Sequence, residues 1–301
     1  MIGFANWEDR PALAALWQIS FDEERRYANF FFNNRFLPEN CLVYRSGNKV
    51  AAMLHLLPAW VVQNGKPVRA HYVFACATQP EHRSHGYMNA LLAYAALVGT
   101  QREEQYSVIL PANRSLYKYY AKSDYQTFFE RDEYELSDLQ MRAFASERLW
   151  SRAVLPPGQL NGIRDKALQN QNGSVLWDDV SFWFAVQNQL SYGGKLVCAE
   201  GAQGVGYALC RTAERDTCEV TELISSGNSL PDVLAGILKE MPAPLYRLRL
   251  PKNSGLLKRF AREPLPLPSS TACGMIKPLG GVSLEQLNVG QNAPYLGLGK
   301  D

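Results

Sequence analysis

Residues 73–97 read VFACATQPEHRSHGYMNALLAYAAL and contain the clearest structural pattern in the chain. The apolar run Val73–Thr78 predicts a buried strand, and Pro80 marks its end. Beyond a short basic turn, apolar side chains recur at helical spacing as far as Gly99, which predicts a helix buried along Met88, Leu91, Leu92, Ala95 and Val98. The stretch therefore predicts a strand, a loop and a helix in direct succession.

The loop between the predicted strand and helix has the properties of a phosphate site. Gly86 can adopt a positive φ and has no Cβ to keep an anion away from the backbone. The start of the following helix offers unpaired N–H groups and the positive end of the helix dipole. Neither a Walker loop nor the three-glycine dinucleotide fingerprint is present, so these two kinds of phosphate site are excluded.

A second strand-to-helix pattern lies about twenty residues further on. Tyr106–Pro111 predicts a strand, and Asn113–Tyr125 predicts a short helix rich in tyrosine. Asp124, just before the last tyrosine, is a residue type that tolerates the left-handed conformation. Aromatic residues in a short helix also pack in cores, so a purely structural role for these tyrosines stays open.

Both patterns resemble the signatures of the GNAT superfamily of N-acetyltransferases. Arg83 and Gly86 match the family's Q/R-x-x-G-x-G/A loop, and Met88 replaces its last small residue, as in the Eis-like branch. Tyr120 and Tyr125 match the tyrosine and final aromatic residue of the second signature. The resemblance covers about residues 1–137 and implies a mixed-sheet α/β (α+β) fold.

The resemblance also implies acetyl transfer from acetyl-CoA to a primary amine, without a metal. It implies that Tyr120 is the general acid, with Tyr117 as the rival, and that Asp301 supplies the base through a terminal carboxylate, with a water-linked group as the alternative. Pantetheine is expected along the backbone of Cys76, Ala77 and Thr78. The other expected cofactor-binding residues are Arg83, Ser84, His85, Gly86, Tyr87, Met88, Asn89 and Asn113.

From Ser137 onward the element order of the first half recurs without clear sequence identity. We expect helices at 139–150, 160–169, 231–240 and 253–261, and strands at 195–200, 204–211, 218–224, 246–250 and 272–276. The stretch 177–192 is rich in aromatic residues. The loop ISSGNSLP, which corresponds to TQPEHRSHG, is shorter and lacks the arginine, so no CoA is expected there. The sequence thus predicts two tandem GNAT-like domains, at 1–137 and at 138–301, the second degenerate and completing the acceptor pocket. Phe128–Leu136 is the predicted closing strand of the first domain.

The bulk composition is that of an ordinary globular protein. The chain has 301 residues, 47% hydrophobic and 20% charged, and a net charge of +2, which gives no argument for a nucleic-acid partner. Six scattered cysteines favour buried free thiols. The start of the chain lacks a signal-peptide pattern and there is no run of 18 apolar residues, so no membrane partner and a cytoplasmic location are expected.

The acceptor is not identified by the sequence. A small-molecule or peptide amine is expected, and an aminoglycoside, a polyamine, a peptide N-terminus and lysine all stay open, as does a homo-oligomer. His55 and His71 alternate with apolar residues and are expected to pack rather than to react. The acidic stretch Asp22–Glu24 is either a solvated helix start or a patch facing a cationic amine. A non-catalytic acyl-CoA sensor and a purely structural two-domain protein are the alternative functions.

Overall fold

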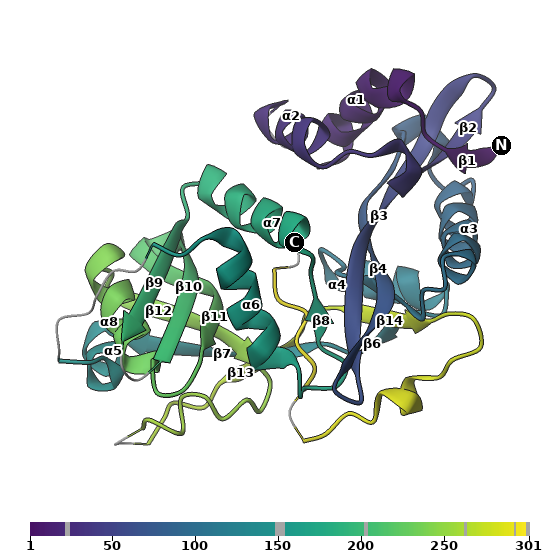
Figure 1. Ribbon diagram of the computed structural model, residues 1–301. Coiled ribbons are helices and arrows are strands. Elements are labelled where there is room, and N and C mark those ends of the chain that lie inside the picture. Colours follow the sequence, from purple (N-terminus) through teal and green to yellow (C-terminus); the bar gives the residue numbers. More distant parts are fainter. Residues whose placement is uncertain (22–24, 148–153, 202–203, 262–263, 292, 299–301) are drawn as a thin grey trace.

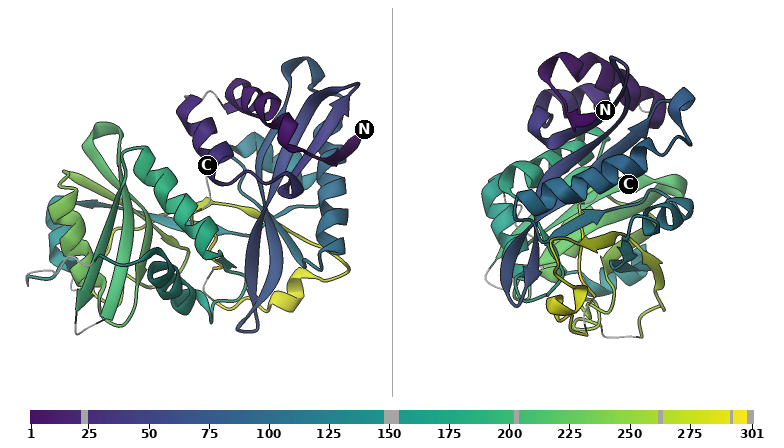
Figure 2. Two further views of the ribbon diagram at one scale, coloured as in Figure 1. Left: turned by 45° about the horizontal axis from the view of Figure 1, so that its top comes forward. Right: turned by 90° about the vertical axis from the view of Figure 1, so that its right-hand side faces the viewer.

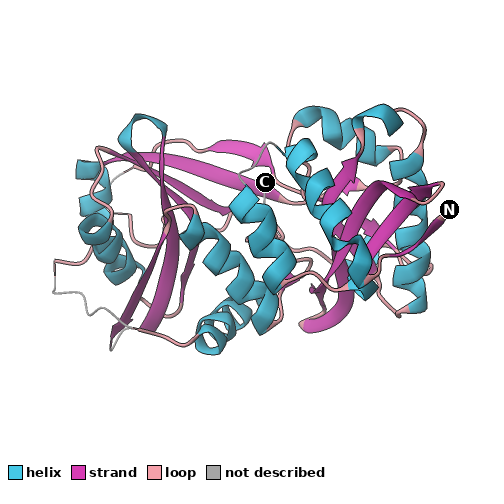
Figure 3. Ribbon diagram, turned by 90° about the horizontal axis from the view of Figure 1, so that it is seen from above, coloured by secondary structure: helices cyan, strands magenta, loops and turns pink. Residues whose placement is uncertain are grey.

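The computed structural model describes residues 1–21, 25–147, 154–201, 204–261, 264–291 and 293–298. In this part of the chain, two mixed sheets stand side by side with helices on their faces (Figure 1). Figure 3 shows the same arrangement from above, with the helices between and outside the sheets. The fold class expected from the sequence, a mixed α/β structure with two tandem units, is confirmed.

The first sheet has the order β1-β2-β3-β4-β5-β14-β6, and β8 pairs with β3. Helices α1 and α2 contact one face of it, and α3 and α4 pack on the other. The strands are β1 (Ile2–Phe4), β2 (Cys41–Ser46), β3 (Lys49–Gln63), β4 (Lys66–Thr78), β5 (Tyr106–Ile109), β6 (Gln126–Thr127), β8 (Val175–Leu176) and β14 (Met275–Pro278). The helices are α1 (Arg10–Phe21), α2 (Arg25–Asn34), α3 (Tyr87–Gln101) and α4 (Arg114–Ala121).

The second sheet has the order β13-β7-β12-β11-β10-β9. Helices α6 and α7 lie on the side that faces the first half, and α5 and α8 cover the opposite side (Figure 1). The strands are β7 (Glu130–Ser137), β9 (Lys195–Gly201), β10 (Gly204–Ala213), β11 (Thr217–Ser225), β12 (Leu245–Pro251) and β13 (Ser269–Ala272). The helices are α5 (Asp138–Phe144), α6 (Pro157–Leu168), α7 (Asp179–Ser191) and α8 (Leu230–Glu240).

The two halves exchange a strand. β14 follows the second half in sequence but lies between β5 and β6 in the first sheet, and Figure 2 shows this yellow segment running into the first half. In return, β7 lies between β12 and β13 in the second sheet. The prediction that Phe128–Leu136 closes the first sheet is therefore wrong. The two sheets therefore do not separate at the expected boundary, residue 137, because each contains a strand from the other half of the chain.

A matching pair of strand–helix–strand units supports the internal repeat. β4 and β5 pair in parallel from Ala70↔Tyr106 to Val73↔Ile109, with α3 between them in sequence. β11 and β12 pair in parallel over the same number of residues, from Thr217↔Leu245 to Val220↔Leu248, and are joined through α8. The arrangement of elements thus repeats even though the loops before the two helices differ.

Helix α3 has the core face that the sequence predicts. Met88, Leu91, Leu92, Ala95 and Val98 are all buried, together with Gly99, and they pack on the first sheet. A Cβ at Gly99 would lie 2.7 Å from Leu279 and 2.8 Å from His71, so a larger residue would push the helix off the sheet.

One local prediction is corrected. Residues 253–261 form turns instead of a helix, because Asn253 and Gly255 have positive φ values of 59° and 66°. β3 runs through Pro58 without interruption. β2 pairs with β3 only as far as His55, so the missing N–H of Pro58 breaks no bond on that side. No helix in the described residues is both long and apolar enough to span a membrane.

Candidate acyl-CoA and acceptor site

β4 and β5 separate in the middle of the first sheet. Their pairing ends at Val73↔Ile109, whereas β4 stays paired with β3 as far as Thr78. Within β4, Ala75 has a φ of 52° at the point where the register with β3 shifts. The segment from residue 74 to 78 therefore has one edge along which no described strand pairs. An extended ligand with alternating donors and acceptors could pair with this edge.

Tyr120 reaches this opening from α4. Its side chain is buried, and its hydroxyl lies close enough to the thiol of Cys76 on β4 to affect the pKa of both groups. Burial raises the pKa of Tyr120 well above its ordinary value, and the neighbouring Cys76 adds to the effect, so the hydroxyl keeps its proton at neutral pH. Burial also raises the pKa of Cys76 to about 12, which leaves this cysteine as a neutral thiol. The site thus holds a protonated hydroxyl beside a sulfur atom.

Tyr125 and Asp124 anchor the end of the tyrosine-rich helix. The hydroxyl of Tyr125 lies 2.6 Å from Ser107 Oγ on β5, and both side chains are buried. Asp124 has a φ of 66°, the left-handed conformation expected at this position. Tyr117, the alternative acid, is partly buried and packs against the same cluster as Tyr120.

The loop before α3 has the backbone of an anion site. Ser84 and Gly86 have positive φ values of 64° and 77°, and a Cβ built on Gly86 would have no atom within 4 Å. α3 begins immediately afterwards at Tyr87, so the N–H groups of its first turn have no acceptor within the helix. Arg83 is exposed and its Nε donates to Thr78 O at 3.3 Å, which brings the guanidinium to the end of β4. This loop therefore has room and donors for a pyrophosphate.

Aromatic rings surround the loop, and the sequence analysis missed two of them. Tyr87 stacks on Tyr44 of β2, with ring centroids 3.9 Å apart. His82 and His85 each lie 5.7 Å from the Tyr87 ring. Tyr44 belongs to no motif, and only the fold brings it to this place, whereas His82 lies in the loop itself but was not among the expected cofactor-binding residues.

Two expected site residues have positions that the sequence did not indicate, and a third lies outside the described residues. Asn113 is the N-cap of α4, and its side-chain oxygen accepts from Ser115 N at 3.1 Å and Leu116 N at 3.2 Å. The side chain of Met88 is buried in the core, so this residue offers only its backbone N–H to the loop. Asp301 lies outside the described residues, as does the acidic stretch 22–24.

A cavity of about 270 Å³ lies between the two halves. Phe74 and Leu110 line it, and these residues directly follow the last paired residues of β4 and β5. The cavity therefore reaches the point where the two strands separate. Its lining residues are Arg35, Leu57, Tyr72, Phe74, Leu110, Arg131, Trp177, Ser181, Phe184, Ala185, Asn188, Gln189, Tyr192, Arg211, Thr221, Arg249, Cys273, Tyr295, Leu296, Gly297 and Leu298.

The C-terminal segment closes one side of this cavity. Tyr295 donates from its backbone to Ser174 Oγ, and the carbonyl of Leu296 accepts from the buried Arg164. Gly297 and Leu298 follow directly and line the cavity. Residues 295 and 296 thus anchor the C-terminal segment beside the cavity.

The two histidines that were expected to pack are both buried. His71 Nδ1 lies 2.6 Å from Glu104 Oε2 beneath α3. His55 lies among the rings of Phe31, Phe32 and Phe36, and burial lowers its pKa to about 3. Neither histidine lines the cavity.

Comparison with known proteins agrees with this geometry. A family model for the acetyltransferase (GNAT) domain matches residues 3–128. No curated protein matches the chain.

Three solved structures share the fold of almost the whole chain. A GCN5-related N-acetyltransferase from Anabaena variabilis has a TM-score of 0.75 at 16% identity, over 92% of this chain and 72% of its own. Eis1 from Mycobacterium abscessus has a TM-score of 0.71 at 14% identity, over 92% and 73%. A tandem GNAT protein from the clavulanic acid biosynthesis pathway has a TM-score of 0.51 at 13% identity, over 94% and 100%. Residues 3–128 therefore match the acetyltransferase (GNAT) domain family, within a chain that shares its fold with Eis1 and with the tandem GNAT protein.

Proposed function

We propose that the protein transfers an acetyl group from acetyl-CoA to a primary amine by direct attack of the amine on the thioester. One observation carries this proposal. The cavity between the halves reaches the point where β4 and β5 separate, and Tyr120 contacts Cys76 on the unpaired stretch of β4. A donor in the opening and an acceptor in the cavity would thus meet beside a protonated hydroxyl.

The residues around β4 suit acetyl-CoA. The backbone of Cys76, Ala77 and Thr78 is extended and unpaired on one edge, which fits the amide groups of pantetheine. The N–H groups from Ser84 to Asn89, next to the open Cβ position of Gly86, would hold the pyrophosphate. Arg83 lies in the same loop, and its positive charge would add to the attraction for the pyrophosphate.

Tyr120 is proposed as the general acid. When the neutral amine attacks, the new C–N bond forms and the C–S bond breaks, and the departing thiolate takes a proton from the Tyr120 hydroxyl. The surplus proton on the new amide nitrogen then restores the Tyr120 hydroxyl. Because burial keeps this hydroxyl protonated, it can donate at any pH near neutrality. The acceptor ammonium must first lose a proton to a base, which stays unassigned, and Asp301 remains a candidate for it.

The two halves are proposed to have separate tasks. Residues 1–137 would bind acetyl-CoA, and residues 138–301 would complete the acceptor pocket through α7, the second sheet and the C-terminal segment. The loop before α8 begins beyond Ser225 and supplies no arginine, so a second CoA site is not proposed there.

Thiol release from acetyl-CoA tests the proposal. The protein is incubated with acetyl-CoA and a broad amine library, and free CoA and acetylated products are measured, the products by mass spectrometry. Calorimetry with acetyl-CoA runs in parallel. Binding together with acetylated product supports the proposal. Binding without any product leaves the non-catalytic acyl-CoA sensor, and the absence of binding leaves the structural two-domain protein.

A further inference from the structure

The cavity between the halves has a cationic wall. Four of its lining residues are arginines, namely Arg35, Arg131, Arg211 and Arg249, and the described lining includes no aspartate or glutamate. A cavity lined by charges of one sign focuses its potential and concentrates ligands of the opposite sign. The positive charges of the wall would repel an amine acceptor that carries no anionic group.

The carboxylates that neutralise the sheet arginines lie behind them. Arg131 pairs with Glu133 at 2.8 Å, and Arg249 pairs with Glu219 at 2.6 Å. Arg211 also contacts Glu219, at 2.5 Å, and Glu219 is only 2% exposed. The cross-strand register places these side chains on one face of the second sheet, with the carboxylates outside the described cavity lining. The guanidinium groups are thus held in place while their cationic face remains toward the cavity.

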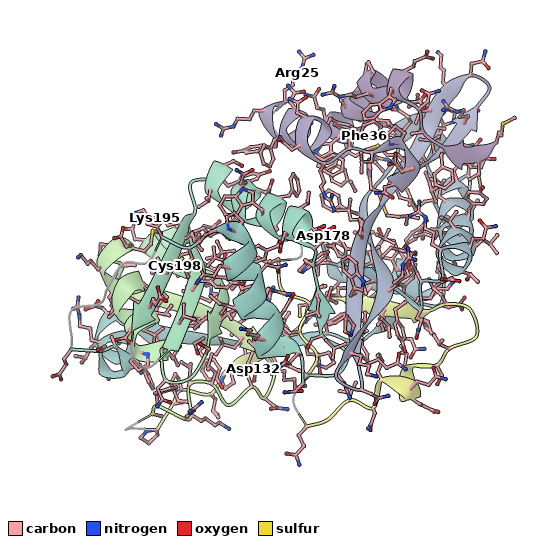
Figure 4. The ribbon with its side chains drawn as sticks, viewed as in Figure 1. Arg25, Phe36, Asp132, Asp178, Lys195 and Cys198 are labelled. Carbon is pink, nitrogen blue, oxygen red and sulfur yellow. The ribbon has the colours of Figure 1, made fainter. Side chains whose placement is uncertain are left out.

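Arg35 is the buried charge of this wall. It follows α2 and is 8% exposed, and its Nη2 donates to the neutral hydroxyl of Ser181 on α7. Its ion pair with Asp178 spans 3.9 Å, and that carboxylate also caps α7 by accepting from Ser181 N at 2.6 Å. Figure 4 labels Asp178 and Phe36, the neighbour of Arg35, on the two sides of the junction.

Neighbouring groups balance the positive charge of Arg35 only in part. Its Nε is buried and has no acceptor among the described residues. The indole Nε1 of Trp177, another lining residue, is also buried without an acceptor among the described residues. Both groups are donors, so what the wall lacks is an acceptor. A buried cation with a distant carboxylate is costly, and an anionic ligand group beside it would offset that cost.

Besides the neutral polar residues Ser181, Asn188, Gln189 and Thr221, most of the remaining wall is apolar or aromatic. Tyr72 and Trp177 meet edge to face with ring centroids 5.4 Å apart, and Phe74 and Phe184 continue the same wall. The volume of about 270 Å³ lies near the lower end of the range for small-molecule sites, which is about 300–1,000 Å³. The cavity therefore fits a small apolar body with one charged end.

We propose that the acceptor is a small amine that also carries a carboxylate on an apolar or aromatic body, with the carboxylate directed to Arg35 and the arginines of the second sheet. The inference rests on the proposed acetyl transfer, because it assigns the acceptor of that reaction. It favours a molecule like a free amino acid. It disfavours aminoglycosides and polyamines, whose several positive charges the wall repels.

Matched acceptor pairs test the inference. Phenylalanine, leucine and 4-aminobutanoate are each compared with the corresponding amide, and phenethylamine, spermidine and kanamycin complete the panel. Thiol release from acetyl-CoA gives kcat/KM for each amine. The carboxylates should exceed their amides by about 10- to 100-fold, the worth of one charge-assisted hydrogen bond. Equal rates within every pair, or faster acetylation of spermidine or kanamycin, would overturn the inference.

Variants at Arg35 identify the source of the preference. Arg35→Gln should raise KM for the carboxylate acceptor about 10- to 100-fold and leave that of its amide nearly unchanged. Arg35→Lys should keep part of the preference, because the charge remains. Arg142→Gln is the matched control, since Arg142 is exposed on α5 and paired with Asp138 one helical turn away. An undiminished preference in Arg35→Gln would remove Arg35 from the proposal.

A binding measurement separates this inference from the proposed reaction. Phenylalanine, its amide and N-acetylphenylalanine are titrated calorimetrically into the protein and into Arg35→Gln. Binding of the two carboxylates but not of the amide, without any thiol release, would leave the anion site standing and reject acetyl transfer. Thiol release only with amines that lack a carboxylate would do the reverse. If neither carboxylate binds more tightly than the amide, the inference fails.

Discussion

Arg164 and Glu222 form an ion pair at 3.0 Å in which neither side chain has any exposed surface. Arg164 also donates to the carbonyls of Val175 and Leu296, at 2.8 Å and 3.1 Å. The hydroxyls of Tyr207 and Tyr295 add hydrogen bonds to the carboxylate. One buried guanidinium thus ties together α6, β8, β11 and the C-terminal segment beside the cavity.

Loss of that guanidinium should be strongly destabilising. Arg164→Met would leave Glu222 as an unpaired buried charge, which costs about 3–5 kcal/mol. Chemical denaturation followed by fluorescence measures the free energy of unfolding. The double change Arg164→Met with Glu222→Leu should recover much of the loss, and Arg142→Met on the surface should change little. A single Arg164 variant within about 1 kcal/mol of the parent protein would contradict the assigned role.

Replacement of Tyr120 should slow catalysis and spare binding. Tyr120→Phe keeps the buried ring and removes the proton donor, so kcat should fall by about 10²- to 10⁴-fold. Acetyl-CoA affinity, measured by calorimetry, should stay the same. Tyr117→Phe is the matched comparison on the same helix. An unchanged kcat for Tyr120→Phe, with a large loss for Tyr117→Phe, would transfer the acid role to Tyr117.

Negative charge in the loop before α3 should abolish acetyl-CoA binding. Arg83→Glu with Gly86→Asp puts two carboxylates where the pyrophosphate is expected, and position 86 has a φ of 77°. Calorimetry should then detect no binding, while circular dichroism should show an intact fold. Gly255→Asp is the control, because Gly255 also has a positive φ of 66° and open space around its Cβ position but lies in the second half. Retained affinity in the loop variant would refute the loop assignment.

Stability should fall as the pH drops below about 6.5, in part because of His55. Burial lowers its pKa from 6.5 to about 3, so the folded state keeps this imidazole neutral while the unfolded state takes up a proton. The free energy of unfolding should therefore decrease by about 1.4 kcal/mol per pH unit from this group alone, between about pH 6.5 and 3. His55→Phe should reduce the slope of the unfolding free energy against pH by that amount. A parallel curve for the variant would show that His55 does not titrate in this way.

Much of the acetyl-CoA side of the site could be predicted because its signals are local. The strand end, the positive φ of Gly86, the start of α3 and its buried face all follow from residues that are neighbours in sequence. The left-handed Asp124 follows for the same reason. Each of these depends on backbone preferences and helical periodicity, which a sequence displays directly.

The acceptor side could not be predicted in the same way. Arg35, Ser181 and Arg249 are brought together by the packing of two halves, and none of them belongs to a motif. The strand exchange is equally hidden, because an apolar strand of period two has the same pattern whichever sheet it joins. The turns at residues 253–261 were missed since Asn253 and Gly255 can be helical, and only the fold imposes a positive φ on both.

Because of the exchanged strands, neither half of the chain can be removed or replaced without breaking a sheet of the other half. An N-terminal fragment that ends at residue 137 would lack β14, and the edge of β5 would face water as a template for aggregation. The complementary fragment would lack β7 and expose β12 in the same way. Each half thus supplies a strand that the other half needs to complete its sheet. Recombination that shuffles one half without the other would destroy both sheets.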